Sequence, residues 1–273
     1  MTLAADGART RLQVGPVTLA YRRYGRGDAP AVLLLHGAAA HSGWWDEVAP
    51  LLASTHHVVA ADLSGHGDSS HRSAYSAETW SAEVAAILGA TTDGPAVVVG
   101  HSMGGLVAIA AAARSPRLVS SLVLVDTRLP LSGLPTPTRP PRLFRSDTEA
   151  LDRFRLLPEH TNADPRLLRR LARDGLRRTP DGWRWKFDPS ARRRFTNDGV
   201  REDLKRVRCP VAYIHGARSD MGGPDSRRRL EQWLGRPVAA AVVPDAFHHV
   251  PLDQPTACAA TVNSFLGSPE QEH

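Results

Sequence analysis

The sequence predicts an α/β fold in which a mostly parallel sheet is covered by helices on both faces. Short apolar runs rich in β-branched residues alternate with segments of helical spacing over the first 126 residues, and the alternation returns after residue 209. Strands with near-continuous apolar sequence are typical of parallel sheets that are buried on both faces. The 273 residues, 42% hydrophobic and 23% charged, suffice for one large domain of this class.

The expected elements follow in chain order. Before the alternation breaks we expect strands at Val17–Tyr24, Ala31–Leu35, Val58–Ala61, Ala96–Val99 and Leu122–Val125, with helices at Ala77–Leu88 and Leu106–Ala113. After it resumes we expect strands at Pro210–Gly216 and Val238–Val243 and a last helix at Thr256–Leu266. The order predicts βαβ units and therefore parallel pairing of most strands.

An insertion separates the two halves of this pattern. Five prolines fall between Leu129 and Pro141, which excludes a helix or a central strand there. Arginine-rich stretches of helical spacing follow at Leu143–Leu156 and Pro165–Arg177. We therefore expect a core made of residues 1–130 and 205–273, interrupted by a mostly helical cap over residues 131–204.

A candidate nucleophile lies where the strand Ala96–Val99 gives way to a helix. The residues Gly100-His101-Ser102-Met103-Gly104 fit the pattern G-x-S-x-G. This pattern is typical of a strained turn that exposes a serine at the top of a sheet, with glycines where a Cβ would clash. The pentapeptide alone is a weak signal, so its partners decide the interpretation.

A nucleophilic serine needs a base within hydrogen-bond reach and a carboxylate that orients the base. On this type of fold the chain order is serine, acid, histidine. Asp220 follows the strand Pro210–Gly216, and His248 follows the strand Val238–Val243. Because parallel strands end at the same sheet edge, we expect Ser102, Asp220 and His248 to converge there.

In these residues the chain resembles the α/β-hydrolase superfamily, in the form that carries a helical cap after the sixth strand. The resemblance covers nearly the whole core and rests on motifs in the family's order. They are the turn His36-Gly37, the D-x-x-G-x-G-x-S loop over Asp62–Ser69, the acid loop Gly216–Asp220, and His248 followed by Val250–Pro255.

Two assignments within this resemblance have rivals. Phe247 stands where the family usually has glycine, and the adjacent His249 is an alternative base. His248 is favoured because it keeps the family's spacing to the segment that follows. Asp126, directly after the strand Leu122–Val125, orients the histidine in some relatives, whereas Asp220 fits the more frequent position.

The resemblance implies a serine hydrolase that cleaves an ester-type bond (an ester or lactone, or a thioester) through an acyl-enzyme on Ser102. The backbone N–H groups of Ala38 and Met103 would form the oxyanion hole. The long cap favours a small or medium-sized substrate. An acyltransferase or cyclase, a carbon–carbon bond hydrolase, a cofactor-free oxygenase and a non-catalytic binding protein are the alternatives on this scaffold.

Three further residues near the motifs are candidates for substrate contact: His36, His101 and Trp44. Each also has a structural interpretation. His36 would brace its turn, His101 occupies a variable position of the serine turn, and Trp44 would pack on the core.

Charge and composition narrow the function classes. The net charge is +6, and the segment Leu131–Arg208 carries 20 Lys and Arg against 11 Asp and Glu, nearly all of the cations arginine. No basic region with heptads, zinc spacing or aromatic stacking platform accompanies it, so we expect no nucleic-acid partner.

We expect no metal and no cofactor. The two cysteines, the lack of a signal-peptide pattern and the lack of a long apolar run predict a cytoplasmic protein without a membrane partner. The oligomeric state stays open.

Overall fold

A computed structural model of the chain describes residues 7–129, 142–191 and 195–266. It contains an eight-stranded sheet in the order β1-β2-β4-β3-β5-β6-β9-β10. Pairing is antiparallel between β1 and β2 and between β2 and β4, and parallel elsewhere. The strands are β1 (Ala8–Val14), β2 (Val17–Tyr24), β3 (Ala31–Leu35), β4 (His57–Ala61), β5 (Ala96–His101), β6 (Val119–Val125), β9 (Val211–Gly216) and β10 (Ala239–Val243). The predicted mostly parallel α/β fold is confirmed.

The central strands are buried on both faces, as their continuous apolar sequence predicted. In β3, Leu33 and Leu35 belong to one hydrophobic cluster and Val32 and Leu34 to a second cluster. The same alternation holds along β6. Because successive side chains of a strand point to opposite faces, these two clusters are the cores on the two sides of the sheet.

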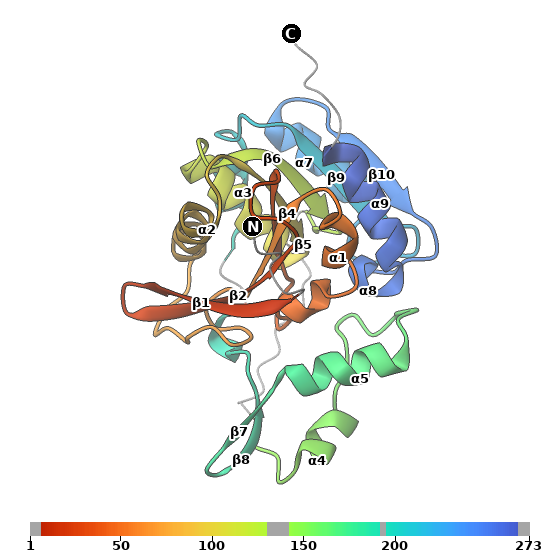
Figure 1. Ribbon diagram of the computed structural model, residues 1–273. Helices are drawn as coiled ribbons and strands as arrows, with labels where there is room; N and C mark the ends of the chain where they lie inside the picture. Colours follow the sequence, from red (N-terminus) through yellow and green to blue (C-terminus); the bar gives the residue numbers. More distant parts are fainter. Residues whose placement is uncertain (1–6, 130–141, 192–194, 267–273) are drawn as a thin grey trace.

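Helices cover both faces (Figure 1). One face packs on α2 (Ala77–Thr91), α3 (Met103–Arg114), α6 (Asn197–Leu204) and α7 (Pro224–Leu234); the other packs on α1 (Ala49–Leu52), α8 (Val250–Asp253) and α9 (Pro255–Leu266). A short 3₁₀ helix, η1 (Ser42–Trp45), follows β3. No helix within the described ranges is long and apolar enough to cross a bilayer.

The inserted segment forms a separate lobe below the sheet in the view of Figure 1. It holds α4 (Asp147–Asp152), α5 (Pro165–Asp174) and the antiparallel pair β7 (Leu176–Thr179) and β8 (Gly182–Trp185). The 3₁₀ helix η2 (Pro189–Ala191) follows, and its Ala191 packs in the core. The hairpin was not expected in a mostly helical cap. Its apolar residues, Trp183 and Trp185 among them, pack with Phe144 and Leu151 inside the lobe.

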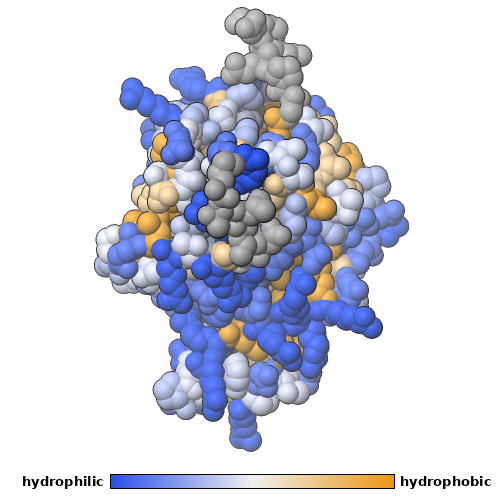
Figure 2. All heavy atoms as spheres, in the orientation of Figure 1, coloured by the Kyte–Doolittle hydropathy of each residue, from blue (hydrophilic) through white to orange (hydrophobic). Residues whose placement is uncertain are grey.

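The lobe is joined to the core by charged and polar contacts and by a small apolar cluster that includes Leu171 and Leu252. Asp174 at the end of α5 accepts hydrogen bonds from Arg22 and Arg9, each at 3.3 Å. Lys186 lies 2.7 Å from Asp68. Hydrophilic side chains cover much of the lobe on the face seen in Figure 2. The predicted end of the cap at residue 204 stays a prediction, and α6 within that range packs against α3 and α7 of the core.

Strained backbone marks the edge at which the parallel strands end. Among the described residues other than glycine, positive φ angles occur at Ala39 after β3 (59°), Ser102 after β5 (53°), Asp126 after β6 (47°) and Asp245 after β10 (55°). Such conformations cost free energy outside glycine and cluster at functional sites. We therefore expect the active site at this edge of the sheet.

Candidate active site

The serine turn has the geometry that its sequence predicted. Ser102 stands between β5 and α3 with φ 53° and ψ −117°. A Cβ at Gly104 would lie 2.7 Å from the carbonyl oxygen of His36, and one at Gly100 would meet the backbone of Gly105 at 2.5 Å. Larger residues at the two glycines would push the turn out of its position against β3. Ser102 itself is half-buried and directs its hydroxyl to His248.

His248 lies between the serine and a buried carboxylate. Its Nδ1 is 2.8 Å from Oδ1 of Asp126, and its Nε2 is 3.1 Å from Oγ of Ser102. A carboxylate can only accept, so Nδ1 carries the proton and Nε2 presents its lone pair to the serine hydroxyl. This chain of hydrogen bonds is the arrangement by which a histidine takes a proton from a serine.

Asp126 stands where the sequence led us to expect Asp220. Its side chain is 0% exposed, whereas that of Asp220 is 71% exposed and lies 3.5 Å from His160. The expectation that Asp220 orients the histidine is therefore corrected to Asp126. Both aspartates follow strands that end at the same edge, and sequence order alone does not decide which one turns inward.

The loop after β9 holds Asp126 in place instead of supplying the acid. The Oδ1 atom of Asp126 accepts from the hydroxyl of Ser219 at 2.6 Å and from the N–H of Gly222 at 2.9 Å. Its Oδ2 atom accepts from the N–H of Gly216 at 2.9 Å. A Cβ at Gly222 would lie 2.7 Å from the Asp126 carboxylate, which explains the glycine there. With the bond from His248, the carboxylate accepts four hydrogen bonds, and these fix its position beside the imidazole.

The backbone around the serine offers candidate N–H donors. Met103 is the first residue of α3, so its N–H has no intrahelical acceptor. Gly37 approaches Ser102 so closely that a Cβ there would lie 3.4 Å from the serine Cβ, and Ala38 follows it directly. Ala38 is exposed and Met103 is buried. Their role as the oxyanion hole stays a prediction.

His36 and His101 are placed as structural residues rather than at a substrate surface. His36 is 1% exposed; its Nδ1–H donates to the carbonyl of Gly37, and its Nε2 accepts from the N–H of Leu63. Burial lowers its pKa to about 4, which keeps it neutral. His101 is 3% exposed and hydrogen-bonds through Nε2 to the carbonyl of His248 at 2.9 Å. For both residues the expected substrate contact gives way to bracing of the turn and of the histidine loop.

Trp44 and His249 form the border between the core and the inserted lobe. Trp44 is half-buried, packs with Leu171 and Leu252, and meets the ring of His249 edge-on at 5.5 Å. His249, the alternative base, hydrogen-bonds through Nε2 to the carbonyl of Pro158 at 2.8 Å, whereas the hydrogen bond to Ser102 comes from His248. Burial, followed by the nearby His248, lowers its pKa to about 4. Substrate contact by Trp44 stays a prediction.

Comparison with known proteins extends this picture. A family model described as the alpha/beta hydrolase family matches residues 32–261. Esterase Rv0045c of Mycobacterium tuberculosis is 32% identical, over 94% of this chain and 88% of its own length. The pimeloyl-[acyl-carrier protein] methyl ester esterase of Neisseria meningitidis is 31% identical, over 86% of this chain and 93% of its own. The thioesterase domain from the curacin biosynthetic pathway shares the fold, with a TM-score of 0.80 at 24% identity, over 95% of this chain and all of its own.

Proposed function

The chain belongs to the α/β hydrolase family, and from this premise we propose that it is a serine hydrolase acting through Ser102, His248 and Asp126. The observation that carries the proposal is the continuous hydrogen-bonded chain from the half-buried Ser102 hydroxyl through His248 to the fully buried Asp126 carboxylate. Ester-cleaving relatives over most of the chain support an enzyme of this type.

In the proposed reaction, Oγ of Ser102 attacks an ester-type carbonyl while Nε2 of His248 takes the hydroxyl proton. Asp126 holds the Nδ1–H and stabilises the imidazolium that forms. The N–H groups of Met103 and Ala38 hold the charge that develops on the carbonyl oxygen. His248 then protonates the leaving group, which departs and leaves an acyl group on Ser102. A water molecule activated by His248 releases the acid and restores the serine.

We propose a small or medium-sized acyl substrate, because the inserted lobe reaches the catalytic histidine loop. The Nε2–H of His249 donates to Pro158 of the lobe, and Asn162 donates its side-chain amide to the carbonyl of Asp245. Two relatives are named as esterases, one of them specific for a methyl ester, which favours carboxylic ester cleavage over other reactions of this fold. No metal or organic cofactor takes part in the proposed steps.

The proposal is tested by hydrolysis of short-chain p-nitrophenyl esters with three purified proteins. The wild type is compared with Ser102→Ala and with Ser54→Ala, a control serine that is exposed on the surface. We expect Ser102→Ala to lose at least about 10⁴-fold in kcat, because the nucleophile acts as a unit with its base. Ser54→Ala should keep the wild-type rate. Undiminished hydrolysis by Ser102→Ala would rule out the proposed mechanism.

A further inference from the structure

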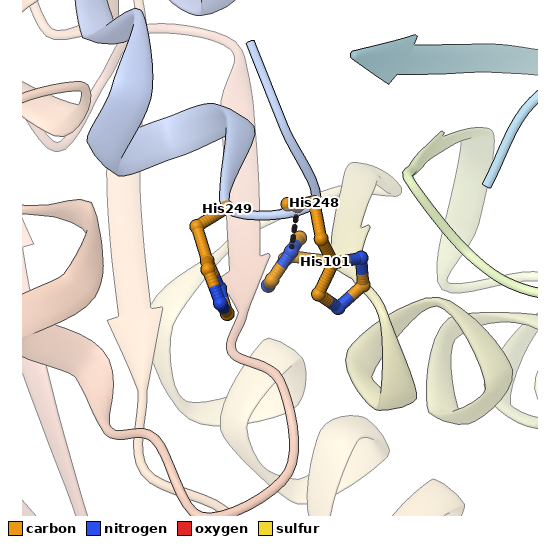
Figure 3. Close-up of side chains that lie close together, drawn as sticks. All are labelled: His101, His248 and His249. Atoms are coloured by element: carbon orange, nitrogen blue, oxygen red, sulfur yellow. Dashed lines mark hydrogen bonds between the residues drawn. The ribbon is translucent and has the colours of Figure 1, made fainter. Parts of the chain in front are cut away.

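Three buried histidines meet beside the nucleophile. His101 comes from the end of β5, and His248 and His249 come from the loop after β10 (Figure 3). In this view the ring of His101 lies between the other two. The ring centroid of His248 lies 4.9 Å from that of His101 and 5.1 Å from that of His249. One ring nitrogen from each residue lies within 4.8 Å of one from each of the others.

Each of these imidazoles has one nitrogen committed to an oxygen acceptor. His248 donates from Nδ1 to Asp126, His101 from Nε2 to the carbonyl of His248, and His249 from Nε2 to the carbonyl of Pro158. Because these oxygens can only accept, the second nitrogen of every ring carries a lone pair. A ring N–H that donates to a carboxylate or a backbone carbonyl is the usual outer partner of a histidine that binds a metal.

The second nitrogen of His249 is an independent observation that points to a ligand at this cluster. Its Nδ1 atom is buried and has no hydrogen-bond partner, while the residue as a whole is 2% exposed. Buried polar atoms are nearly always paired, so this one calls for an explanation.

We propose that His101, His248 and His249 form a binding site for a divalent transition-metal ion such as Zn²⁺, and that the bound ion inhibits the enzyme. Imidazole nitrogens suit Zn²⁺ and its neighbours, and Zn²⁺ accepts three protein ligands plus a water. Nitrogens bound at about 2.0–2.1 Å to a tetrahedral ion lie about 3.4 Å apart, so the ring nitrogens, which lie within 4.8 Å of one another, would have to close by up to about 1.4 Å on binding. The proposed catalytic steps need no metal, and the metal site shares His248 with them.

Inhibition follows from the ligand that the ion would take, and this part of the inference rests on the proposed function. The lone pair on Nε2 of His248 faces Oγ of Ser102 at 3.1 Å and accepts its proton in the reaction. Once that lone pair binds an ion, His248 can no longer act as the base. The ion therefore competes directly with proton transfer.

The test measures binding without relying on activity. Metal-free Ser102→Ala protein is titrated with Zn²⁺ in a calorimeter, alone and with His249→Gln or His101→Gln added. Glutamine keeps an N–H donor for the carbonyl partner and removes the ring lone pair. His160→Gln is the control, because His160 is exposed beside Asp220 and outside the cluster. Thermal melts verify that each variant is folded.

We expect one Zn²⁺ per chain, and at least a 100-fold weaker affinity in His249→Gln and in His101→Gln, since even an outer partner is worth 10–100-fold. His160→Gln should bind like its parent. Absence of Zn²⁺ binding, or equal affinity in the cluster variants, would overturn the site. With Ser102 intact, Zn²⁺ should inhibit ester hydrolysis reversibly, and a chelator should restore the rate. Binding without inhibition would overturn the inhibitory role, whereas an ester-inactive wild type would count against the proposed function and not against the site.

Discussion

The replacement Asp126→Asn tests whether Asp126, which hydrogen-bonds to His248, orients that histidine in place of Asp220, which the sequence favoured. Asp126 accepts three hydrogen bonds on Oδ1 and one on Oδ2. The amide oxygen of asparagine should therefore take the Oδ1 side, and its NH₂ group should face the N–H of Gly216. The buried site then loses its negative charge beside the histidine while its shape is kept.

The size of the effect follows from the distance between the charges. The carboxylate oxygen lies 2.8 Å from Nδ1 of His248, which places the centres of the carboxylate and the imidazolium about 4 Å apart. At an effective dielectric constant of about 20, that attraction is worth about 4 kcal/mol, and it exists only when the imidazole is charged. A loss of this size lowers kcat about 10³-fold, near the roughly 10⁴-fold effect of the same change in a serine protease.

The assay compares kcat for p-nitrophenyl ester hydrolysis in the wild type, Asp126→Asn and Asp220→Asn. Asp220 is exposed and pairs with His160, so its replacement should change the rate less than about 3-fold. Asparagine at 126 also leaves an amide facing the Gly216 N–H, which should cost about 1–3 kcal/mol of stability, so rates are measured well below each melting temperature. A large loss in Asp220→Asn together with a small one in Asp126→Asn would refute the assignment.

Three further predictions concern stability. Folding lowers the pKa of His36 from 6.5 to about 4, so as the pH falls the unfolded chain binds a proton before the folded one does. The contribution of His36 to stability is therefore full above pH 6.5 and falls by ~3 kcal/mol towards pH 4. The free energy of unfolding in urea should depend less on pH in His36→Gln than in the wild type, and an equal dependence would contradict this prediction. Gly104→Ala should lower the free energy of unfolding by about 3 kcal/mol, or Tm by about 10 °C, because the added Cβ would meet backbone atoms. The control Gly89→Ala lies in open space on α2 and should raise Tm slightly. Both Tm values are measured by calorimetry, and an unchanged Tm in Gly104→Ala would contradict the packing argument. Asp174→Asn should lower Tm by no more than about 4 °C, since a loss of about 1 kcal/mol shifts Tm by about 2–4 °C in a chain of this size. It should nevertheless speed proteolysis within residues 142–191 several-fold, and unchanged cleavage would mean that other contacts hold the lobe.

The positions of Ser102 and His248 could be predicted from the sequence because local rules fix both. The glycines around Ser102 are required by backbone approaches within a few residues of the turn and by its contact with β3. His248 keeps its spacing to the short helix α8, whose Asp253 accepts from the N–H of Phe247 and fixes the loop. Local constraints of this kind can be recognised in a single sequence.

The carboxylate partner of His248 could not be predicted because its position depends on contacts between loops that are distant in sequence. Asp126 and Asp220 follow β6 and β9, which are neighbours in the sheet. Only the folded loop shows that Ser219 and Gly222 donate to Asp126 while Asp220 points to solvent. The paired glycines at 222–223 were the available signal, since one of them leaves room for a carboxylate.

The inserted lobe was predicted less completely than the core. The helical spacing located α4 and α5 within the expected stretches, but the hairpin of β7 and β8 went unrecognised. Alternating Trp183 and Trp185 indicated an extended segment, and its partner strand is arginine-rich and carries little apolar pattern. Pairing of short, half-exposed strands depends on the surrounding lobe more than on their own sequence.

The central claim is that Ser102 becomes acylated, and mass spectrometry of the protein treated with a fluorophosphonate tests it most directly. We predict one adduct per chain on the peptide that contains Ser102, formed in the wild type and absent from Ser102→Ala, and formed far more slowly in His248→Gln because the base is lost. An adduct on another residue, or labelling of Ser102 that is indifferent to His248, would contradict the account.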